Sequence, residues 1–282
     1  MDVLDLVTTL RGYGWDWAHG LHVARDTRPT NRMAFAFCAL LSTIWNGMLC
    51  GAFHRAIHAF TRDFGSGPTG QSIFDETLPF PVRYFRASII SILVVLTIYS
   101  GVQLTHNAFT VLGVLVFGQD PAQWPPAFDQ PWFSTSLSDL WSRRWHQNYR
   151  HTIIVCAYPF YLVFGRVGGI IGAFLASGVA HYFLMSAFDS RSELWRMMVG
   201  FGMMAPGVIA EREYYKQTGK KVGGIVGWVW TMSWLLVWGN VIAEGFLKAG
   251  MFGQPSTIDS ESTLWVLLEN LVTNFDAWLH RI

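Results

Sequence analysis

The chain has 282 residues, of which 51% are apolar and only 14% are charged, and its formal net charge is +1. A soluble domain of this size carries about a quarter charged residues, so the composition argues against a soluble protein and indicates lipid as the solvent. The near-neutral charge gives no indication of a nucleic acid or of a generally anionic partner.

Four long stretches carry no formal charge, and each reaches the roughly 20 residues that a helix needs to cross the hydrocarbon core of a bilayer. They are residues 33–53, 87–119, 167–188 and 222–243. Two shorter apolar stretches, residues 152–165 and 197–210, fit buried bundle helices, re-entrant segments or spans that their neighbours extend. We therefore predict an all-α, multi-pass membrane protein with about five to seven membrane helices in one domain, residues 1–282.

The connections between these stretches carry their own signals. Residues 65–81 are rich in Gly, Pro, Ser and Thr and predict a loop, and the four prolines of residues 120–131 rule out a regular helix there. Helical spacing returns after Ser136, which can cap a helix, as can Ser138. Apolar residues then repeat every three to four positions, at Leu137, Leu140, Trp141 and Trp145. We predict an amphipathic helix along the membrane interface here, and a final or interfacial helix over residues 264–279.

His181 is an ionisable side chain in the middle of the uncharged stretch 167–188. Such a group is expensive to bury in lipid, so we expect it to face the bundle interior or a wet cavity. Gly172, Ser177 and Gly178 are small enough to let neighbouring helices approach closely. A neutral imidazole suits general base catalysis, for example removal of a proton from an alcohol that attacks a thioester. The alternative is a histidine that only hydrogen-bonds a neighbouring helix.

A second cluster of functional side chains surrounds Arg143 and Arg144, which lie between two tryptophans and are followed by His146. Guanidinium groups hold phosphate through paired hydrogen bonds, while neighbouring indoles stack on a purine. The same residues can equally anchor an interfacial helix in lipid. The basic segment 212–221 is open to the same two interpretations, interfacial anchoring or binding of an anionic head group.

Residues 124–147 carry the most specific motif: they begin WPPAF, continue through Pro131 and Trp132, and end SLSDLWSRRWHQ, ahead of the apolar stretch with His181. In addition, residues 11–17 read RGYGWDW. Together these runs resemble the wax-synthase branch of the membrane-bound O-acyltransferase superfamily, most closely its fungal members, in which an RG-x-GW-x-W segment opens the core. The resemblance covers about residues 11–245.

This resemblance implies transfer of an acyl group from acyl-CoA to the hydroxyl of a lipophilic alcohol, such as a fatty alcohol, a terpenoid or a sterol-like compound. It identifies His181 and His146 as the catalytic positions, the second of which is asparagine in plant members. With the chemistry of the residues themselves, it assigns Arg143, Arg144 and Trp145 to binding of the acyl-CoA co-substrate. We expect no metal and no permanently bound cofactor. The expected setting is multi-pass in the endoplasmic reticulum membrane, and a homo-oligomer is compatible with it.

Members of this branch usually carry further membrane helices before the RG-x-GW segment, so we expect a chain that is short at its N-terminus relative to the family. A non-catalytic multi-pass scaffold or transporter is the alternative function. A di-iron desaturase is disfavoured because its site needs about eight histidines at HxxxH and HxxHH spacings. His54 and His58 stand four residues apart here, but no two of the nine histidines are adjacent.

Overall fold

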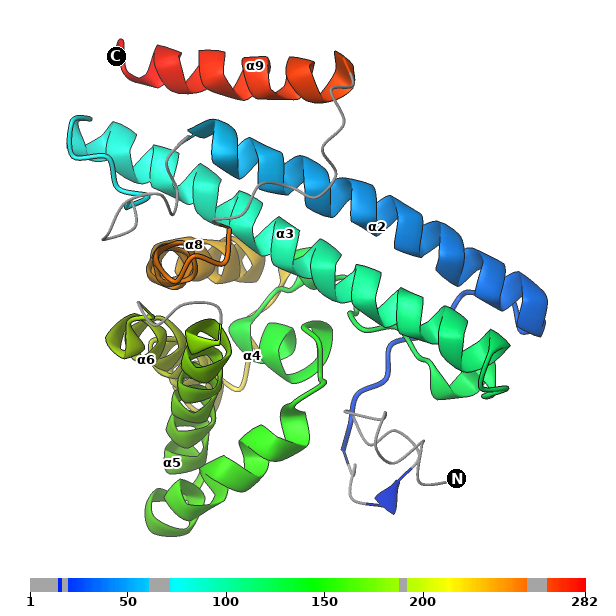
Figure 1. Cartoon of the computed structure of the whole chain (residues 1–282). Helices are drawn as coiled ribbons and strands as arrows, with labels where there is room; N and C mark the ends of the chain where they lie inside the picture. The colour runs from blue at the N-terminus through cyan, green and yellow to red at the C-terminus, as the bar shows by residue number, and fades with distance from the viewer. Residues whose placement is uncertain (1–14, 17–19, 61–71, 188–191, 253–262) are drawn as a thin grey trace. The chain divides into compact units, whose positions relative to one another are not determined.

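The computed structural model describes residues 15–16, 20–60, 72–187, 192–252 and 263–282, and every regular element within them is helical (Figure 1). This confirms the predicted all-α fold class. Most of the RG-x-GW-x-W segment and the first part of the predicted loop 65–81 lie outside the described residues.

Four of the described helices are long and apolar enough to cross a membrane. They are α2 (Arg32–Phe60), α3 (Phe80–Leu115), α5 (Arg150–Ser186) and α8 (Gly224–Lys248). Each contains most or all of one uncharged stretch of the sequence, so the lack of charge and the length of those stretches correctly indicated where the long helices lie.

The described residues contain four such helices, where five to seven membrane helices were predicted. The difference arises from the two shorter apolar stretches. Residues 152–165 belong to the first arm of α5 and are not a separate helix. Residues 197–210 are divided between α6 (Leu194–Gly202) and α7 (Met204–Thr218), each of which is too short to cross a bilayer alone.

The chain divides into two compact units, each assembled from three separate stretches of sequence. Unit 1 consists of Met1–Thr43, Gln103–Ser177 and Gly202–Trp234. Unit 2 consists of Ile44–Val102, Gly178–Phe201 and Leu235–Ile282. Each of the four long helices therefore contributes one part to each unit.

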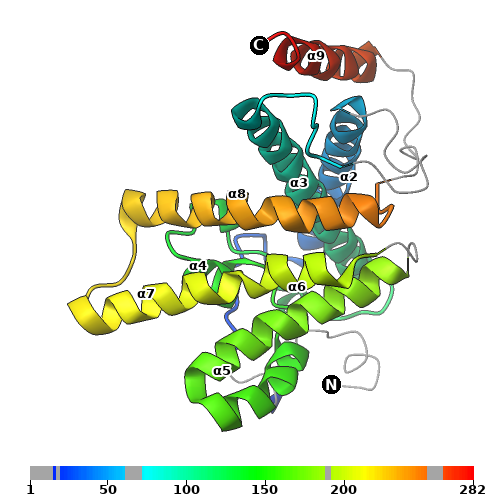
Figure 2. The ribbon, with the colours of Figure 1, turned by 90° about the vertical axis from the view of Figure 1, so that its left-hand side faces the viewer.

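In unit 1, α5 bends sharply at Gly165, where φ is 61° and ψ is −149°. These angles are accessible to glycine but strained for residues with a Cβ. The arm after the bend packs closely against the arm before it. A Cβ added at Gly168 would lie only 2.3 Å from the carbonyl oxygen of Phe160, so this approach requires a glycine. Figure 2 shows the resulting bent helix.

Several short helices connect the long ones. In unit 1 these are η2 (Pro121–Gln123), η3 (Pro131–Phe133), α4 (Leu137–Asp139) and the π-helical turn η4 (Leu140–Arg144). As the prolines predicted, residues 120–131 contain no α-helix, only short 3-10 turns. The predicted final helix is α9 (Thr263–Leu279) in unit 2.

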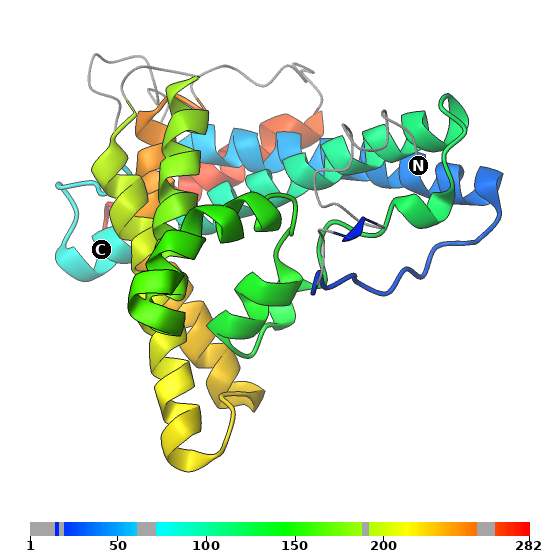
Figure 3. The ribbon, with the colours of Figure 1, turned by 90° about the horizontal axis from the view of Figure 1, so that it is seen from below.

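Unit 2 has one continuous apolar core, formed by α9, α6 and parts of α2, α3, α5 and α8. Within it the α2 and α3 segments lie side by side and run in opposite directions (Figures 1 and 3). The guanidinium of Arg86 on α3 is buried here, with the residue only 2% exposed. Its Nε donates to Asp276 of α9 at 2.6 Å, and its Nη2 donates to the carbonyl of Phe60 at 2.7 Å. A buried charge is tolerable only with such partners, so this pair fixes α9 on α2 and α3.

We expect Asp276→Asn to lower the free energy of unfolding by about 3 to 5 kcal/mol, because it leaves the buried Arg86 guanidinium without its counter-charge. Glu269→Gln is the matched control on the same helix. Its ion pair with Arg55 is also formed (2.9 Å), but the Glu269 side chain is 45% exposed, so the loss should be about 1 kcal/mol or less. Denaturant unfolding of the detergent-solubilised protein measures both. Equal losses in the two variants would contradict this description of the core.

Candidate functional site

The segment with the candidate residues Arg143 to His146 begins at a helix cap. Ser136 accepts a hydrogen bond from the backbone N–H of Asp139 at 3.0 Å, which confirms the predicted cap. The α-helix is short and widens at once into the π-helical turn η4, which is closed by a hydrogen bond from the Trp145 N–H to the Leu140 carbonyl at 2.8 Å. Trp145 itself is extended, with φ −75° and ψ 153°.

This geometry corrects the predicted amphipathic helix. The helical spacing continued in the sequence to Trp145, but the π turn ends at Arg144, so Trp145 and His146 follow the helix and do not lie on one of its faces. The physical reason is the buried side chain of Gln147. Its amide donates to the carbonyl of Trp145 at 2.8 Å and to that of Trp141 at 3.3 Å, which turns the chain away from the helix axis.

Glu211 of α7 holds the start of this segment. Its carboxylate accepts from the backbone N–H groups of Leu137 at 2.6 Å and Ser138 at 2.9 Å, and from the indole of Trp230 at 3.0 Å. The first two are N–H groups at a helix start, which have no partner within the helix. Figure 2 shows α7 and the first part of α8 side by side, which brings Trp230 to the same carboxylate. Burial raises the pKa of Glu211, although these hydrogen bonds favour the ionised form.

Glu211 was missed by the sequence reasoning, which considered only the basic residues after it. Its only signal in the sequence is a carboxylate directly after the apolar stretch 197–210, with Glu213 two residues later. Its partners Leu137 and Ser138 are more than 70 residues earlier in the chain, so no local pattern indicates the contact.

His146 lies among aromatic rings in unit 1. Its ring meets those of Phe128 and Trp145 at centroid distances of 5.7 Å, and that of Tyr149 at 6.5 Å. Trp145 also packs edge-on against Phe128 at 5.1 Å. The WPPAF run and the RRWHQ run, which the sequence keeps 15 residues apart, therefore form one aromatic cluster. The environment restrains the imidazole and leaves it partly exposed.

The two arginines have different environments. Arg144 donates from Nε to Asp139 and from Nη1 to the carbonyls of Asp129 and Gln130, both at 3.2 Å. These contacts tie the π turn to the proline-rich loop. Arg143 is exposed, and within the described part of the chain it makes no hydrogen bond or ion pair. Of the pair, Arg143 is the one whose guanidinium is available to an anionic ligand.

His181 lies in unit 2, near the end of α5, and is partly exposed. Its ring stacks on Phe201 of α6 at a centroid distance of 4.1 Å and an angle of 25°, with Phe246 of α8 at 6.1 Å. One turn earlier on α5, a Cβ on Gly178 would lie 2.9 Å from the carbonyl oxygen of Met197. The small residue therefore does allow close approach of α6, as predicted, and this contact brings Phe201 to the histidine.

Comparison with known proteins adds a family match. Residues 124–203 match the model of the membrane bound O-acyl transferase family. All five candidate residues assigned from the sequence lie inside this region: Arg143, Arg144, Trp145, His146 and His181. No solved structure is detectably similar to the chain.

Three curated proteins are similar to the chain. The acetyltransferase ple2 of Rhodocybe pseudopiperita is 23% identical over 90% of this chain and 69% of its own length. The O-Mevalon transferase yanI of Aspergillus niger is 27% identical over 56% of this chain and 36% of its own length. The probable long-chain-alcohol O-fatty-acyltransferase 9 of Arabidopsis thaliana is 24% identical over 55% of this chain and 49% of its own length. The alignments thus span between about a third and two thirds of the length of these relatives.

We expect Glu211→Gln to lower the free energy of unfolding by about 1 to 3 kcal/mol, because an amide has one acceptor oxygen and leaves a buried N–H of Leu137 or Ser138 unpaired. Glu213→Gln, two residues along the same helix, is the control. The Glu213 side chain is 42% exposed and forms a surface ion pair with Lys216, so its loss should be about 1 kcal/mol or less. Denaturant unfolding in detergent compares the two, and a Glu211→Gln variant as stable as the control would contradict the anchoring role.

Proposed function

We propose that this chain is a member of the membrane-bound O-acyltransferase family and that it transfers an acyl group to the hydroxyl of a lipophilic alcohol. Its relatives are named as an acetyltransferase, an O-Mevalon transferase and a long-chain-alcohol O-fatty-acyltransferase. The observation that carries the proposal is His181, a histidine in a candidate membrane helix, inside the family-matched region and stacked on Phe201. We further propose acyl-CoA as the donor and the endoplasmic reticulum membrane as the location.

In the proposed reaction, a neutral imidazole nitrogen of His181 removes the proton of the alcohol as its oxygen attacks the carbonyl carbon of the acyl thioester. The carbon–sulfur bond then breaks, and the leaving thiolate takes the proton from the imidazolium. The ester and the free thiol are the products. No covalent acyl-enzyme is required, so the absence of a G-x-S-x-G nucleophile motif in the sequence is consistent with this chemistry.

The apolar surroundings of His181 suit this role in two ways. Phe201 and Phe246 are each only 5% exposed, so they give the imidazole an apolar environment, which favours its neutral form. The stacking at 4.1 Å also restrains the imidazole ring, which reduces the entropy that must be lost to orient the base.

For the acyl-CoA donor, the exposed Arg143 is the residue that we assign to a phosphate of the nucleotide. Trp145 and His146 follow directly after the π turn that contains Arg143, and His146 can donate or accept one hydrogen bond toward substrate from its aromatic cluster. Asparagine can replace that single hydrogen bond, so we expect His146→Asn to reduce activity less than loss of His181.

We expect His181→Phe to reduce the rate of ester formation by about 10² to 10⁴, because the phenyl ring preserves stacking on Phe201 but cannot accept a proton. Protein level and membrane insertion should stay unchanged. His58→Phe is the matched control, since it replaces another histidine of a long helix in unit 2 that has no assigned role. Ester formation is measured in membranes supplied with acyl-CoA and alcohol. A wild-type rate in His181→Phe would remove the proposed base and favour a non-catalytic protein.

The two arginines should respond differently to substitution. We expect Arg143→Ala to raise KM for acyl-CoA by about tenfold with little change in kcat, because a charge-assisted contact to phosphate contributes about 1.5 to 3 kcal/mol to binding of ground and transition states alike. Arg144→Ala should instead lower stability, since it breaks the contacts to Asp139 and the loop carbonyls. Kinetics and unfolding of both variants separate these effects. An unchanged KM in Arg143→Ala would leave that arginine as a membrane anchor.

A further inference from the structure

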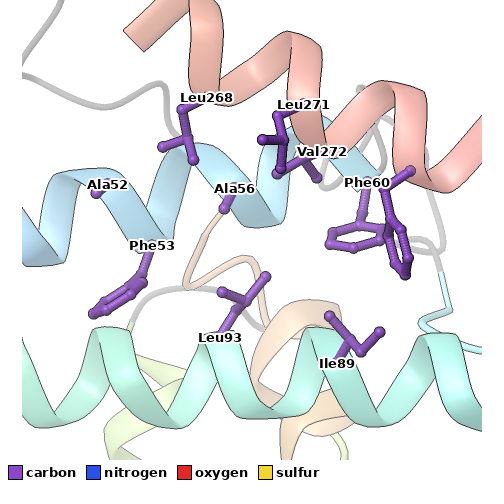
Figure 4. A pocket seen from close by; sticks show the side chains of 10 residues that line it. Ala52, Phe53, Ala56, Phe60, Ile89, Leu93, Leu268, Leu271 and Val272 are labelled. Carbon is purple, nitrogen blue, oxygen red and sulfur yellow. The ribbon is translucent and has the colours of Figure 1, made fainter. Parts of the chain in front are cut away.

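Unit 2 contains an apolar pocket of about 270 Å³ between α2, α3 and α9. Figure 4 shows side chains from all three helices directed into it, among them Ala52 and Phe60 of α2, Leu93 of α3, and Leu268 and Val272 of α9. Every lining residue is apolar. The pocket therefore offers no hydrogen bond to a ligand and suits a hydrocarbon.

Two ion pairs join α9, which forms one wall of this pocket, to α2 and α3. Glu269 pairs with Arg55 at 2.9 Å, and Asp276 pairs with Arg86 at 2.6 Å. The two carboxylates are seven residues apart, which places them on one face of α9, two turns from each other. Leu268 and Val272 share that face, so these apolar lining residues lie close to both ion pairs.

The same ion pairs indicate the charge of the ligand. Arg55 precedes Ala56 on α2, Arg86 lies three residues before Ile89 on α3, and each is neutralised by a carboxylate of α9. A phosphate or carboxylate on the ligand would have to compete with these pairs. An uncharged molecule would not.

The size of the pocket indicates the shape of the ligand. An apolar cavity of roughly 150 Å³ in another protein stays free of water and takes up benzene. At about 270 Å³, this pocket has room for one hydrocarbon chain or a small apolar ring system, with the polar end of the molecule outside it.

The pocket lining and the rings around His181 belong to the same apolar core of unit 2. Ala56, Phe60 and Val272, which line the pocket, belong to the same apolar core as Phe201 and Phe246. Those last two rings are the ones that pack against the imidazole of His181. The pocket lining and the rings that pack on the candidate general base are therefore parts of one core in unit 2.

We propose that this pocket binds the hydrocarbon part of the alcohol acceptor. The proposal rests on the proposed acyltransfer, and it adds a place for the acceptor: between α2, α3 and α9, with its hydroxyl outside the apolar lining. The acyl chain of the donor and a bilayer lipid are the competing occupants, and the experiment is designed to separate them.

Photolabelling tests the binding site without requiring turnover. The probe is a long-chain alcohol with a diazirine in its chain and a terminal alkyne, added to the purified full-length protein in detergent, and the labelled peptides are identified by mass spectrometry. We expect labels on α9 near Leu271 and on α2 near Ala52. Excess unlabelled alcohol should suppress them, whereas a long-chain acyl-CoA or phosphatidylcholine should not.

Two substitutions on α9 test the link to activity. Leu268→Trp enlarges a half-buried lining residue, and Leu267→Trp enlarges its neighbour in sequence, which is 62% exposed and does not line the pocket. We expect Leu268→Trp to lower labelling and to raise KM for a long-chain alcohol about tenfold, with no change in KM for acyl-CoA or for a short alcohol. Leu267→Trp should match the wild type in all four measurements.

The outcomes distinguish this proposal from the proposed function. If ester forms but the label maps outside α2, α3 and α9, the pocket proposal is wrong and acyltransfer stands. If acyl-CoA suppresses the label, the pocket holds the acyl chain, and if phosphatidylcholine does, it holds a bilayer lipid; either result overturns the proposal. If no ester forms from any substrate pair, acyltransfer fails, while suppressible labelling would still establish an alcohol site.

Discussion

The carboxylate of Glu211 fixes the segment on which the candidate site in unit 1 depends. Three N–H donors converge on it, two from the start of α4 and one from Trp230. Because the first turn of a helix has N–H groups without internal partners, a buried carboxylate there stabilises both the helix start and its position. The π turn, the buried Gln147 and the aromatic cluster around His146 follow directly in sequence from this point. The start of a family-matched motif is thus fixed by a residue that the motif does not contain.

In unit 2, too, a buried charge is satisfied by several hydrogen-bond partners, but here the charge is positive. Arg86 is a buried cation in an apolar core, and its guanidinium is satisfied by Asp276 and by the carbonyl of Phe60. A buried charged side chain fixes the position of the helices that carry it and its partners, because separating them would cost several kcal/mol. The position of α9, and with it one wall of the apolar pocket, is set in this way.

The sequence was sufficient for features that depend on local periodicity. The uncharged stretches located α2, α3, α5 and α8, and Ser136 was recognised as a cap because capping is a contact over three residues. Residue type and position also indicated that Gly178 lets a neighbouring helix approach closely. Family resemblance, recognised from the WPPAF and SLSDLWSRRWHQ runs, agrees with the match over residues 124–203.

Features that depend on distant contacts could not be read from the sequence. Leu137 to Trp145 has helical spacing, but the amide of Gln147 and the carboxylate of Glu211 decide where the helix begins and ends. Arg143 and Arg144 are chemically identical neighbours in the sequence. In the structure Asp139 and the loop carbonyls bind Arg144, whereas Arg143 is exposed. Gly165 is one of several glycines in α5, and only its positive φ identifies it as the residue at which the helix bends.

The central claim, that an alcohol oxygen attacks an acyl carbon, is tested most directly by isotope tracing. Membranes that contain the protein are given acyl-CoA and a lipophilic alcohol labelled with ¹⁸O at its hydroxyl, and the ester is analysed by mass spectrometry. Acyltransfer to the hydroxyl predicts that the ester keeps the ¹⁸O in its alkoxy position and that its formation depends on this chain. Failure to form ester from any donor and alcohol tried, or an ester without the label, would contradict the account.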